Sequence, residues 1–444
     1  MNEWNTKALI DADKQFVWHP FTDMREWCAP ENEPLVLVEG HGAVLRDSKG
    51  REYIDGNSSI WTNIHGHNHP RINAAIRRQL DRVAHTSFLG FTNPPAIELA
   101  QAIVGLFPDN SLTRVFFSDD GSTGVEVALG IADQFWRLRH SRKHHFIAFQ
   151  NGYHGDTAGA ASLGAVAMFQ IGSTRWNFPA MQVPNIRALE ALAPAEIAKI
   201  AAVVIEPLIQ GAAGMRLWPA GTLKAVRDWC TRTDTLLIID EVMTGFGRTG
   251  RMFASEHEGV IPDMMVMAKG LSGGYLPLAI TLISEKIFSA FEGSIVEGKA
   301  LAYGHSYTGN ALACAAAKAS LEIFEGERVL DALEPKIRHL SSMLADLEKL
   351  PAVKEVRQCG FMAGIEIKES ANGLKPNLAA AACIEARRHG LLTRPLGNVV
   401  VLMPPLCITV DQLTKAVQAL RLSIADVWHR SVITAGKNAE EITA

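Results

Sequence analysis

The sequence predicts an α/β fold in which a large, mostly parallel β-sheet is sandwiched between helices, with a smaller α+β domain beside it. Two observations support this prediction. Over residues 70–320, short and nearly uninterrupted apolar segments alternate with longer segments of helical periodicity, a pattern typical of parallel strands that are covered on both faces. After residue 320, charged and alanine-rich helical segments alternate with short strands, which indicates a separate α+β unit.

Six apolar segments are the predicted strands of the large sheet. They are RVFFS (114–118), HFIAFQ (145–150), IAAVVIEPL (200–208), TLLIID (235–240), DMMVMA (263–268) and PLAITLIS (277–284). Ligands of such sheets bind beyond the carboxyl ends of the strands, so the residues that follow each strand are the first candidates for a functional site.

The chain divides into four predicted parts. Residues 1–65 hold strand-like pieces that we expect to pack with the smaller domain, residues 66–325 form the large domain, and residues 326–432 form the smaller domain. The last helical pattern covers residues 411–427, and the tail, residues 433–444, is expected to be loose.

The composition is that of an ordinary globular protein, with 444 residues of which 48% are apolar and 20% are charged. The formal net charge of -4 implies no bulk attraction to nucleic acid or to anionic membranes. Widely spaced cysteines without a CxxC pair predict free thiols in a reducing compartment. The N-terminal segment lacks the apolar core of a signal peptide, and no apolar stretch is long enough to span a bilayer. We therefore expect a cytoplasmic protein that binds neither membranes nor nucleic acid.

Lys269 and Asp240 stand at the ends of two predicted strands that follow one another along the chain. Charged groups at the end of a core strand are rarely buried unless they are paired or used in chemistry. These two residues alone leave two interpretations open. One is a structural ion pair, and the other is a lysine that forms a Schiff base while the carboxylate holds a protonated pyridine nitrogen.

Other strand ends carry residues suited to the same kind of ligand. Gly121 and Ser122 open a helical pattern, where free N–H groups favour a phosphate, although an N-cap serine alone would also explain them. Ser306 lies among glycines before a second helical pattern and is a further phosphate candidate. Tyr153 lies in a glycine-bracketed turn, placed either to stack on a flat cofactor or to pack on the surface. Together these features describe a site for pyridoxal 5′-phosphate.

Two other motifs carry less weight. The segment GFGRTG (245–250) matches the dinucleotide-binding pattern, but it follows its strand after several intervening residues and opens no clear helix. His65, His67 and His69 alternate before a proline that begins a helical pattern, and no cysteine or carboxylate completes a metal site with them. We therefore expect neither a nicotinamide or flavin cofactor nor a metal.

Motifs along nearly the whole chain resemble those of the class III (ω-amino) aminotransferases, which are pyridoxal-phosphate enzymes of fold type I. The matching segments include WHPFT (18–22), DGNSSIW (55–61), HGHNHP (65–70), VIEPLIQGAAGM (204–215), DEVMTGFGRTG (240–250), AKGLSGGYLPL (268–278) and GNALACAAA (309–317). The segments NGYHGDT (151–157) and TRPLG (393–397) are most similar to the 8-amino-7-oxononanoate aminotransferases of biotin synthesis. The resemblance implies transamination of 8-amino-7-oxononanoate to 7,8-diaminononanoate.

The resemblance also assigns roles around the cofactor. It implies that Lys269 binds the cofactor as a Schiff base and transfers the proton, that Asp240 pairs with the pyridine nitrogen, and that Tyr153 stacks on the ring. Gly121 and Ser122 would bind the phosphate.

Further implied roles concern the second subunit and the substrate. Ser306 would reach the phosphate of a partner subunit, which implies a homodimer with a shared active site, and Glu206 and Gln210 would lie near the ring. Arg394 would hold a substrate carboxylate, a planar task that suits arginine better than lysine. Further implied substrate-site residues are Arg248 near the channel, Asp156, Trp61 and Gly304.

Two positions bear on the amino donor, S-adenosylmethionine or L-lysine. Family members that use S-adenosylmethionine usually carry a tyrosine and a tryptophan where this chain has Phe21 and Ile60. The change to Phe21 removes one hydroxyl, and the change to Ile60 removes a stacking surface for an adenosyl group. The pattern favours lysine.

Other functions remain open at the level of sequence. One is a different ω-aminotransferase that acts on a diamine or an ω-amino acid. Another is a non-catalytic binding protein on the same fold, which would be expected to lose Lys269 or gain a DNA-binding segment, and this sequence shows neither change.

Overall fold

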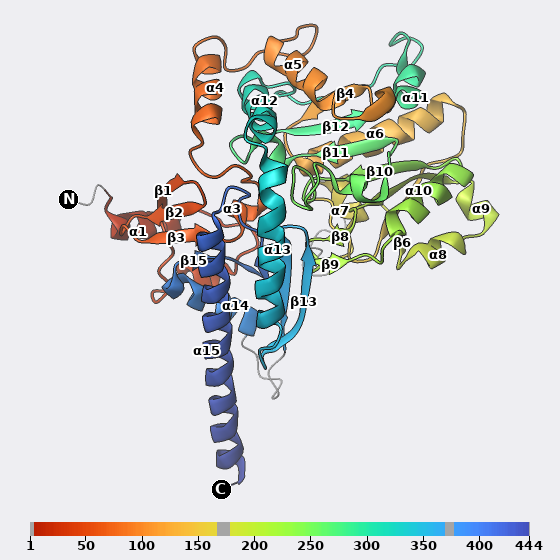
Figure 1. Ribbon diagram of the computed structural model, residues 1–444. Coiled ribbons are helices and arrows are strands. Elements are labelled where there is room, and N and C mark those ends of the chain that lie inside the picture. Colours follow the sequence, from red (N-terminus) through yellow and green to blue (C-terminus); the bar gives the residue numbers. More distant parts are fainter. Residues whose placement is uncertain (1–3, 167–177, 369–376, 444) are drawn as a thin grey trace.

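The computed structural model describes residues 4–166, 178–368 and 377–443 (Figure 1). Its centre is a seven-stranded sheet in the order β4-β12-β11-β10-β7-β5-β6. The strands are β4 (Arg114–Ser118), β12 (Ala279–Ile283), β11 (Met264–Met267), β10 (Leu236–Asp240), β7 (Ile200–Ile205), β5 (His145–Phe149) and β6 (Met181–Val183). β12 is antiparallel to both of its neighbours, and the other pairings are parallel. The predicted mostly parallel sheet is thus confirmed, and β6 is an additional strand.

Both faces of this sheet are covered, as the uninterrupted apolar strands predict. Along β10, Leu236 and Ile238 pack in one apolar cluster with helix α6 (Gly121–Leu138). Leu237 and Ile239 point to the opposite face and pack with helix α10 (Thr222–Arg232). Alternate side chains of a strand point to opposite faces, so a strand buried between two helical layers must be apolar at every position. Figure 1 shows helices on both sides of the sheet.

The N- and C-terminal parts of the chain meet in two smaller sheets. One contains β1 (Leu37–His41), β2 (Val44–Asp47), β3 (Glu52–Asp55) and β15 (Leu391–Leu392), and β15 pairs in parallel with β3. The other contains β13 (Val353–Cys359), β14 (Met362–Ile367), β17 (Val399–Leu402) and β16 (Pro395–Leu396). The short strands β8 (Ile209–Gln210) and β9 (Arg216–Leu217) pair with each other in a separate two-stranded sheet.

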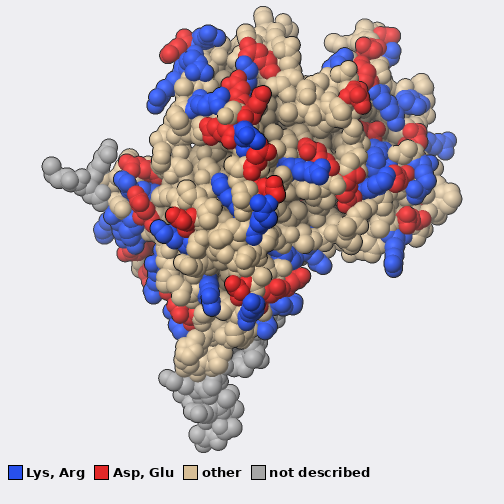
Figure 2. All heavy atoms as spheres, viewed as in Figure 1, with Lys and Arg blue, Asp and Glu red and all other residues tan. Residues whose placement is uncertain are grey.

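The remaining helices surround these sheets. They are α1 (Thr6–Phe16), α2 (Met24–Cys28), α3 (Ser58–Trp61), α4 (Pro70–Leu80), α5 (Pro94–Val104), α7 (Ala158–Leu163), α8 (Ile186–Glu190), α9 (Pro194–Ile197), α11 (Glu285–Phe288), α12 (Ala311–Gly326), α13 (Val329–Leu347) and α14 (Leu378–Ala386). None of the helices in the described ranges is long and apolar enough to cross a membrane. On the face shown in Figure 2, basic and acidic side chains are interspersed.

The last helix, α15 (Val410–Thr443), differs from the prediction. The sequence pattern ends the helix at residue 427 and leaves 433–444 loose, whereas the helix continues to Thr443 and extends away from the body of the molecule in Figure 1. The apolar periodicity ends where the helix leaves the core, but the following residues contain no proline and only one glycine. A single glycine costs a helix about 1 kcal/mol and does not end it. Ala444 lies outside the described residues.

Candidate active site

A cavity of about 810 Å³ opens at the carboxyl ends of β10 and β11, beside the first turn of α6. Large α/β sheets place their ligands at this edge. Many of the predicted site residues line the cavity: Phe21, Ile60, Trp61, Gly121, Ser122, Tyr153, Asp156, Glu206, Asp240, Lys269 and Arg394. The structure therefore brings together residues that are separated by up to several hundred positions in the sequence.

Lys269 and Asp240 reach the cavity from neighbouring strands. β10 and β11 pair in parallel with Asp240 opposite Val266, so Lys269 begins the turn just beyond the end of β11. The backbone of Lys269 is left-handed, with φ 44°, a strained conformation that is common at functional sites. Burial lowers the pKa of Lys269, against the opposing negative charges of Asp240 and Glu206. A lowered pKa makes the neutral, nucleophilic amine more accessible near neutral pH.

Asp240 is held by a residue that the sequence analysis did not single out. Its Oδ2 lies 2.7 Å from Nδ1 of the buried His154, and its Oδ1 accepts a hydrogen bond from the amide of Val242 at 3.0 Å. Burial alone would lower the pKa of His154, but the hydrogen bond and charge of Asp240 outweigh it, so the pKa is raised. The ring of His154 thus keeps Asp240 oriented, and the raised pKa favours its protonated form. The only sequence signal was its place beside Tyr153 in the glycine-bracketed turn.

The first turn of α6 forms a narrow corner whose free amides suit an anion. The amides of Gly121 and Ser122 lie in the first turn, where N–H groups have no partner within the helix. A Cβ atom on Gly155 would lie 2.3 Å from Oγ of Ser122, so the opposite wall must be glycine. Ser122 Oγ in turn accepts a hydrogen bond from the amide of Thr157 at 2.9 Å.

Asp120 precedes this corner and would repel an anion if its carboxylate pointed toward it. The carboxylate instead accepts a hydrogen bond from the amide of Thr123 at 2.9 Å, and Oγ1 of Thr123 accepts one from the amide of Asp120 at 3.0 Å. Asp120 is the N-cap of α6 in a reciprocal capping box.

Hydrogen bonds hold both the backbone and the side chain of Tyr153. Its hydroxyl donates to Oδ2 of Asp156 at 2.8 Å, and its amide donates to Oε2 of Glu206 at 3.1 Å. Glu206 also accepts a hydrogen bond from the amide of Gly211 at 3.0 Å, and burial raises the pKa of its carboxyl to about 7. Burial and the hydrogen bond to Asp156 raise the pKa of Tyr153. These contacts hold the tyrosine ring at the cavity wall.

The rest of the wall comes from the two ends of the chain. Arg394 lies between β15 and β16, and no carboxylate among the described residues lies within ion-pair distance of it, while burial lowers its pKa. The ring centroid of Trp61 lies 4.9 Å from Nζ of Lys269. Phe21 and Ile60 flank the opening, with 65% and 49% of their surfaces exposed. The guanidinium of Arg394, in the wall of the cavity, can bind a substrate carboxylate.

Comparison with known proteins identifies the family of this chain. The family model of the class III aminotransferases matches residues 28–424. The chain belongs to the class III aminotransferases. Two proteins named adenosylmethionine-8-amino-7-oxononanoate aminotransferase are similar to it. The one from Geobacter sulfurreducens is 43% identical over 96% of this chain and 99% of the relative. The one from Nitratidesulfovibrio vulgaris is 45% identical over 95% of this chain and 82% of the relative.

Solved structures give the same result. A crystal structure of adenosylmethionine-8-amino-7-oxononanoate aminotransferase from Methanocaldococcus jannaschii superposes with a TM-score of 0.91 at 38% identity, covering 95% of this chain and 99% of the other. An ω-transaminase from Pseudomonas jessenii superposes with a TM-score of 0.89 at 28% identity, covering 95% and 99%. This chain therefore has the pyridoxal-phosphate-dependent fold type I, and it is an aminotransferase that uses this cofactor.

The residues present suit this cofactor. The amides of Gly121 and Ser122 offer a phosphate site within a cradle that a larger residue at Gly155 would fill. Asp240 offers a carboxylate for the pyridinium nitrogen, and Lys269 offers the amine that binds the aldehyde.

Two of the predicted residues are buried and do not line the cavity. Arg248 was predicted near the substrate channel, but its guanidinium is fully buried and donates to the backbone carbonyls of Pro404 at 2.7 Å and Asn63 at 3.0 Å. Burial lowers its pKa to about 9. It ties the GFGRTG loop to the terminal parts of the chain, a role that a loop motif does not reveal. Gln210 is also buried, and its Nε2 donates to the carbonyl of Gln150 at 2.8 Å.

Two other predicted residues, Ser306 and Gly304, are exposed and do not line the cavity of their own chain. Their segment packs on a loop before α5, where Nε2 of His85 lies 2.8 Å from the carbonyl of Ser306 and Nδ2 of Asn93 donates to the carbonyl of Gly309. That Ser306 serves a second subunit stays a prediction.

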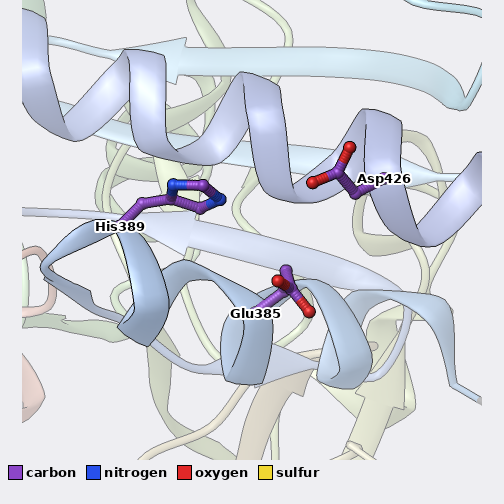
Figure 3. Close-up of side chains that lie close together, drawn as sticks. All are labelled: Glu385, His389 and Asp426. Carbon is purple, nitrogen blue, oxygen red and sulfur yellow. The ribbon is translucent and has the colours of Figure 1, made fainter.

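A separate group of side chains has ligand types that metals use. Glu385, His389 and Asp426 point toward one another between α14 and α15 (Figure 3). Glu385 is already paired with Arg430 at 2.7 Å and with Arg388 at 3.5 Å. These two cations neutralise the carboxylate, so we assign the group to a surface ion-pair network.

Proposed function

We propose that this enzyme transfers an amino group to 8-amino-7-oxononanoate and so makes 7,8-diaminononanoate for biotin synthesis. The observation that carries the proposal is the single cavity that joins Lys269 and Asp240 to Arg394. Relatives that are 43% and 45% identical over nearly the whole chain, and that are named for this acceptor, support it.

Each residue of the cavity has a separate role in the proposed reaction. When bound, pyridoxal phosphate supplies an electron sink for the carbanion that forms when the substrate loses its α-proton. Asp240, held by His154, keeps a positive charge on the pyridine nitrogen favourable. The amine of Lys269, with its lowered pKa, takes up and returns the proton. Tyr153 packs against the ring, and Arg394 binds the substrate carboxylate.

We propose L-lysine as the amino donor. Phe21 has no hydroxyl with which to bind a polar donor, and Ile60 has no aromatic face for an adenosyl group. Both residues line the cavity at its opening, where a bulky donor would have to pass. The names of the relatives favour S-adenosylmethionine instead, so the donor must be tested directly.

The donor test is a half-reaction with the purified holoenzyme. L-lysine or S-adenosylmethionine is added alone, and loss of the yellow absorbance of the bound cofactor is followed. Lysine is expected to bleach the enzyme and S-adenosylmethionine is not. Bleaching by S-adenosylmethionine alone would overturn the lysine assignment and leave the acceptor assignment intact.

The acceptor is tested in the second half-reaction. The bleached enzyme receives 8-amino-7-oxononanoate, and mass spectrometry looks for diaminononanoate while the yellow absorbance returns. Controls receive a simple keto acid or an ω-aldehyde acid. Recovery with these controls but not with 8-amino-7-oxononanoate would identify a different ω-aminotransferase. Reduction with borohydride and peptide mapping should place the cofactor on Lys269.

We also propose that the enzyme is a homodimer in which Ser306 contributes to the partner's phosphate site. Ser306 is exposed, and the neighbouring side chains Leu89, Phe91 and Tyr307 are 85%, 69% and 60% exposed. Large apolar side chains that gather on a surface indicate a protein interface.

A further inference from the structure

Three side chains hold the loop that carries Phe21. Asp13 on α1 accepts a hydrogen bond from Nε2 of His19 at 2.9 Å and from the indole Nε1 of Trp27 on α2 at 2.8 Å. The rings of His19 and Trp27 lie 4.2 Å apart, centroid to centroid. We call these three residues the Asp13 cluster. It joins both helices that flank the loop to a residue of the loop itself.

The loop between α1 and α2 needs such support. Phe21 has a left-handed backbone with φ 52°, which a residue with a large side chain adopts only when its surroundings enforce it. Oγ1 of Thr22 donates to the carbonyl of Pro20 at 2.9 Å and closes the turn. Nζ of Lys14 donates to the carbonyls of Ala29 and Asn32, both at 2.7 Å, and ties α1 to the end of α2.

The loop meets the substrate side of the active site. Pro20 and Phe21 line the same cavity as Lys269 and Arg394. The residues of the Asp13 cluster do not line that cavity, and the side chains of His19 and Asp13 are only 25% and 28% exposed. The cluster can therefore influence a substrate only through the residues that it places.

We propose that Asp13, His19 and Trp27 are positioning residues that fix Phe21 in the wall of the cavity opening and thereby set the affinity for the amino donor. The part about the donor rests on the proposed function, whereas the part about the position of Phe21 does not. A carboxylate that accepts hydrogen bonds from two rings restrains both rings in orientation as well as in distance. Releasing either ring frees the strained turn to relax.

Two conservative variants weaken the hydrogen bonds of the Asp13 cluster, and a third variant serves as a matched control. Trp27→Phe keeps an aromatic side chain, although a smaller one, and removes the N–H donor, and Asp13→Asn keeps the size of the side chain but removes its charge. The control is Asp11→Asn. Asp11 lies on the same helix, and its ion pair is with the exposed Lys7 and not with a residue of the loop. A general effect of changing α1 would appear in the control as well.

The first measurement is structural and needs no substrate. Crystal structures of the wild-type holoenzyme and of the Trp27→Phe and Asp13→Asn holoenzymes are compared at Phe21. In both variants we expect Phe21 to leave its left-handed conformation or its ring to leave the cavity wall, and in Asp11→Asn we expect it to stay. If Phe21 keeps its place in both variants, the cluster does not position it and the proposal is overturned.

The second measurement is a double-mutant cycle on the donor half-reaction. Trp27→Phe should weaken the apparent affinity for the donor by about fivefold, the value of one hydrogen bond, with the maximal bleaching rate little changed. In a Phe21→Ala background the same substitution should have less than about a twofold effect, because two changes that act through one residue are not additive. Equal effects in both backgrounds would overturn the proposal.

The two measurements separate this inference from the proposed function. If neither lysine nor S-adenosylmethionine bleaches the wild-type enzyme, the proposed donors are wrong, and the crystal structures still decide whether the cluster positions Phe21. If the donors react as proposed but Phe21 does not move, the proposed function stands and this inference fails.

Discussion

Asp240 is the residue around which the charges of the active site are arranged. Its two oxygens are held by different groups, the imidazole ring of His154 and the amide of Val242. A buried carboxylate with such partners is held in one orientation. Lys269 lies beyond the end of the neighbouring strand, and its pKa is lowered by burial although Asp240 opposes the change. The pair thus places a carboxylate of fixed orientation and an amine in one cavity.

Replacing His154 by asparagine should slow the reaction without abolishing cofactor binding. Asparagine can still donate a hydrogen bond to Asp240 but cannot carry a positive charge, so this hydrogen bond is weakened, and we predict a decrease in kcat of about 10-fold to 100-fold. Single-turnover bleaching rates and cofactor content are the measurements. His145→Asn, at the start of β5, is the control. A His154→Asn enzyme with the wild-type rate would contradict the positioning role.

Arg394 should determine the affinity for substrates that carry a carboxylate. We predict that Arg394→Lys, which keeps the charge but loses the planar fork, raises the KM for L-lysine about tenfold or more. Inhibition by 1,5-diaminopentane, which is lysine without its carboxylate, should be unaffected. If both compounds lose affinity equally, Arg394 supports the shape of the cavity and does not bind the carboxylate.

At the scale of elements, the sequence predicted the strands of the large sheet and the meeting of β10 and β11 at the site, because a strand buried on both faces leaves a continuous apolar run. The antiparallel direction of β12 was not readable, since strand direction depends on how the connection folds. The contact of His154 with Asp240 joins residues 86 positions apart, and no spacing rule connects them. The burial of Arg248 was missed because a basic residue in a glycine-rich loop gives the same pattern whether it meets substrate or backbone.

The loop that follows β10 is anchored by a buried carboxyl. Oε1 of Glu241 accepts a hydrogen bond from the amide of Ser255 at 2.8 Å, and Oε2 accepts one from Oγ1 of Thr244. Glu241 is fully buried, and burial raises the pKa of its carboxyl to about 7. Between pH 4.5 and about pH 7, the folded protein therefore keeps a proton on Glu241 that the unfolded chain has lost.

This anchor predicts a pH dependence of stability. Between the ordinary pKa of 4.5 and about 7, unfolding releases the proton of Glu241, so the free energy of unfolding falls as the pH rises, by about 3 kcal/mol in all. Glu241→Gln should make this fall smaller. Glu206, whose pKa is also raised to about 7, adds a fall of the same sign, so some pH dependence remains.

The measurement is the urea midpoint of the holoenzyme at about pH 5 and about pH 7.5. Glu258→Gln is the control, because Glu258 is only partly buried and caps α10 through the amides of Gly221 and Lys224. A Glu241→Gln midpoint that falls with pH as steeply as the wild-type midpoint would show that Glu241 does not hold the proton.

At the scale of the whole molecule, the active site is assembled from two sources. The large sheet and α6 supply the residues suited to the cofactor, whereas the terminal parts of the chain, joined by the pairing of β3 and β15, supply Phe21, Trp61 and Arg394 on the substrate side. Substrate preference can therefore change through the terminal parts while the cofactor site is kept. Ser306 lines neither wall in its own chain, and its role in a second subunit is the proposal that the next experiment tests.

Mixing two inactive variants tests the proposed sharing of Ser306 between subunits. Lys269→Ala removes the amine, and Ser306→Asp places a negative charge where a phosphate is expected. If Ser306 acts in the partner's site, a mixed dimer has one site with both defects and one site with none. Random pairing of equal amounts should then restore about one quarter of the wild-type activity, since about half of the dimers are mixed and each has one intact site. If Ser306 acts within its own subunit, both sites of the mixed dimer are defective and co-expression restores nothing.

Activity after co-expression, with cofactor content and the mass of the dimer from light scattering as controls, decides between the two arrangements. A monomeric mass for the active enzyme would contradict the shared site outright.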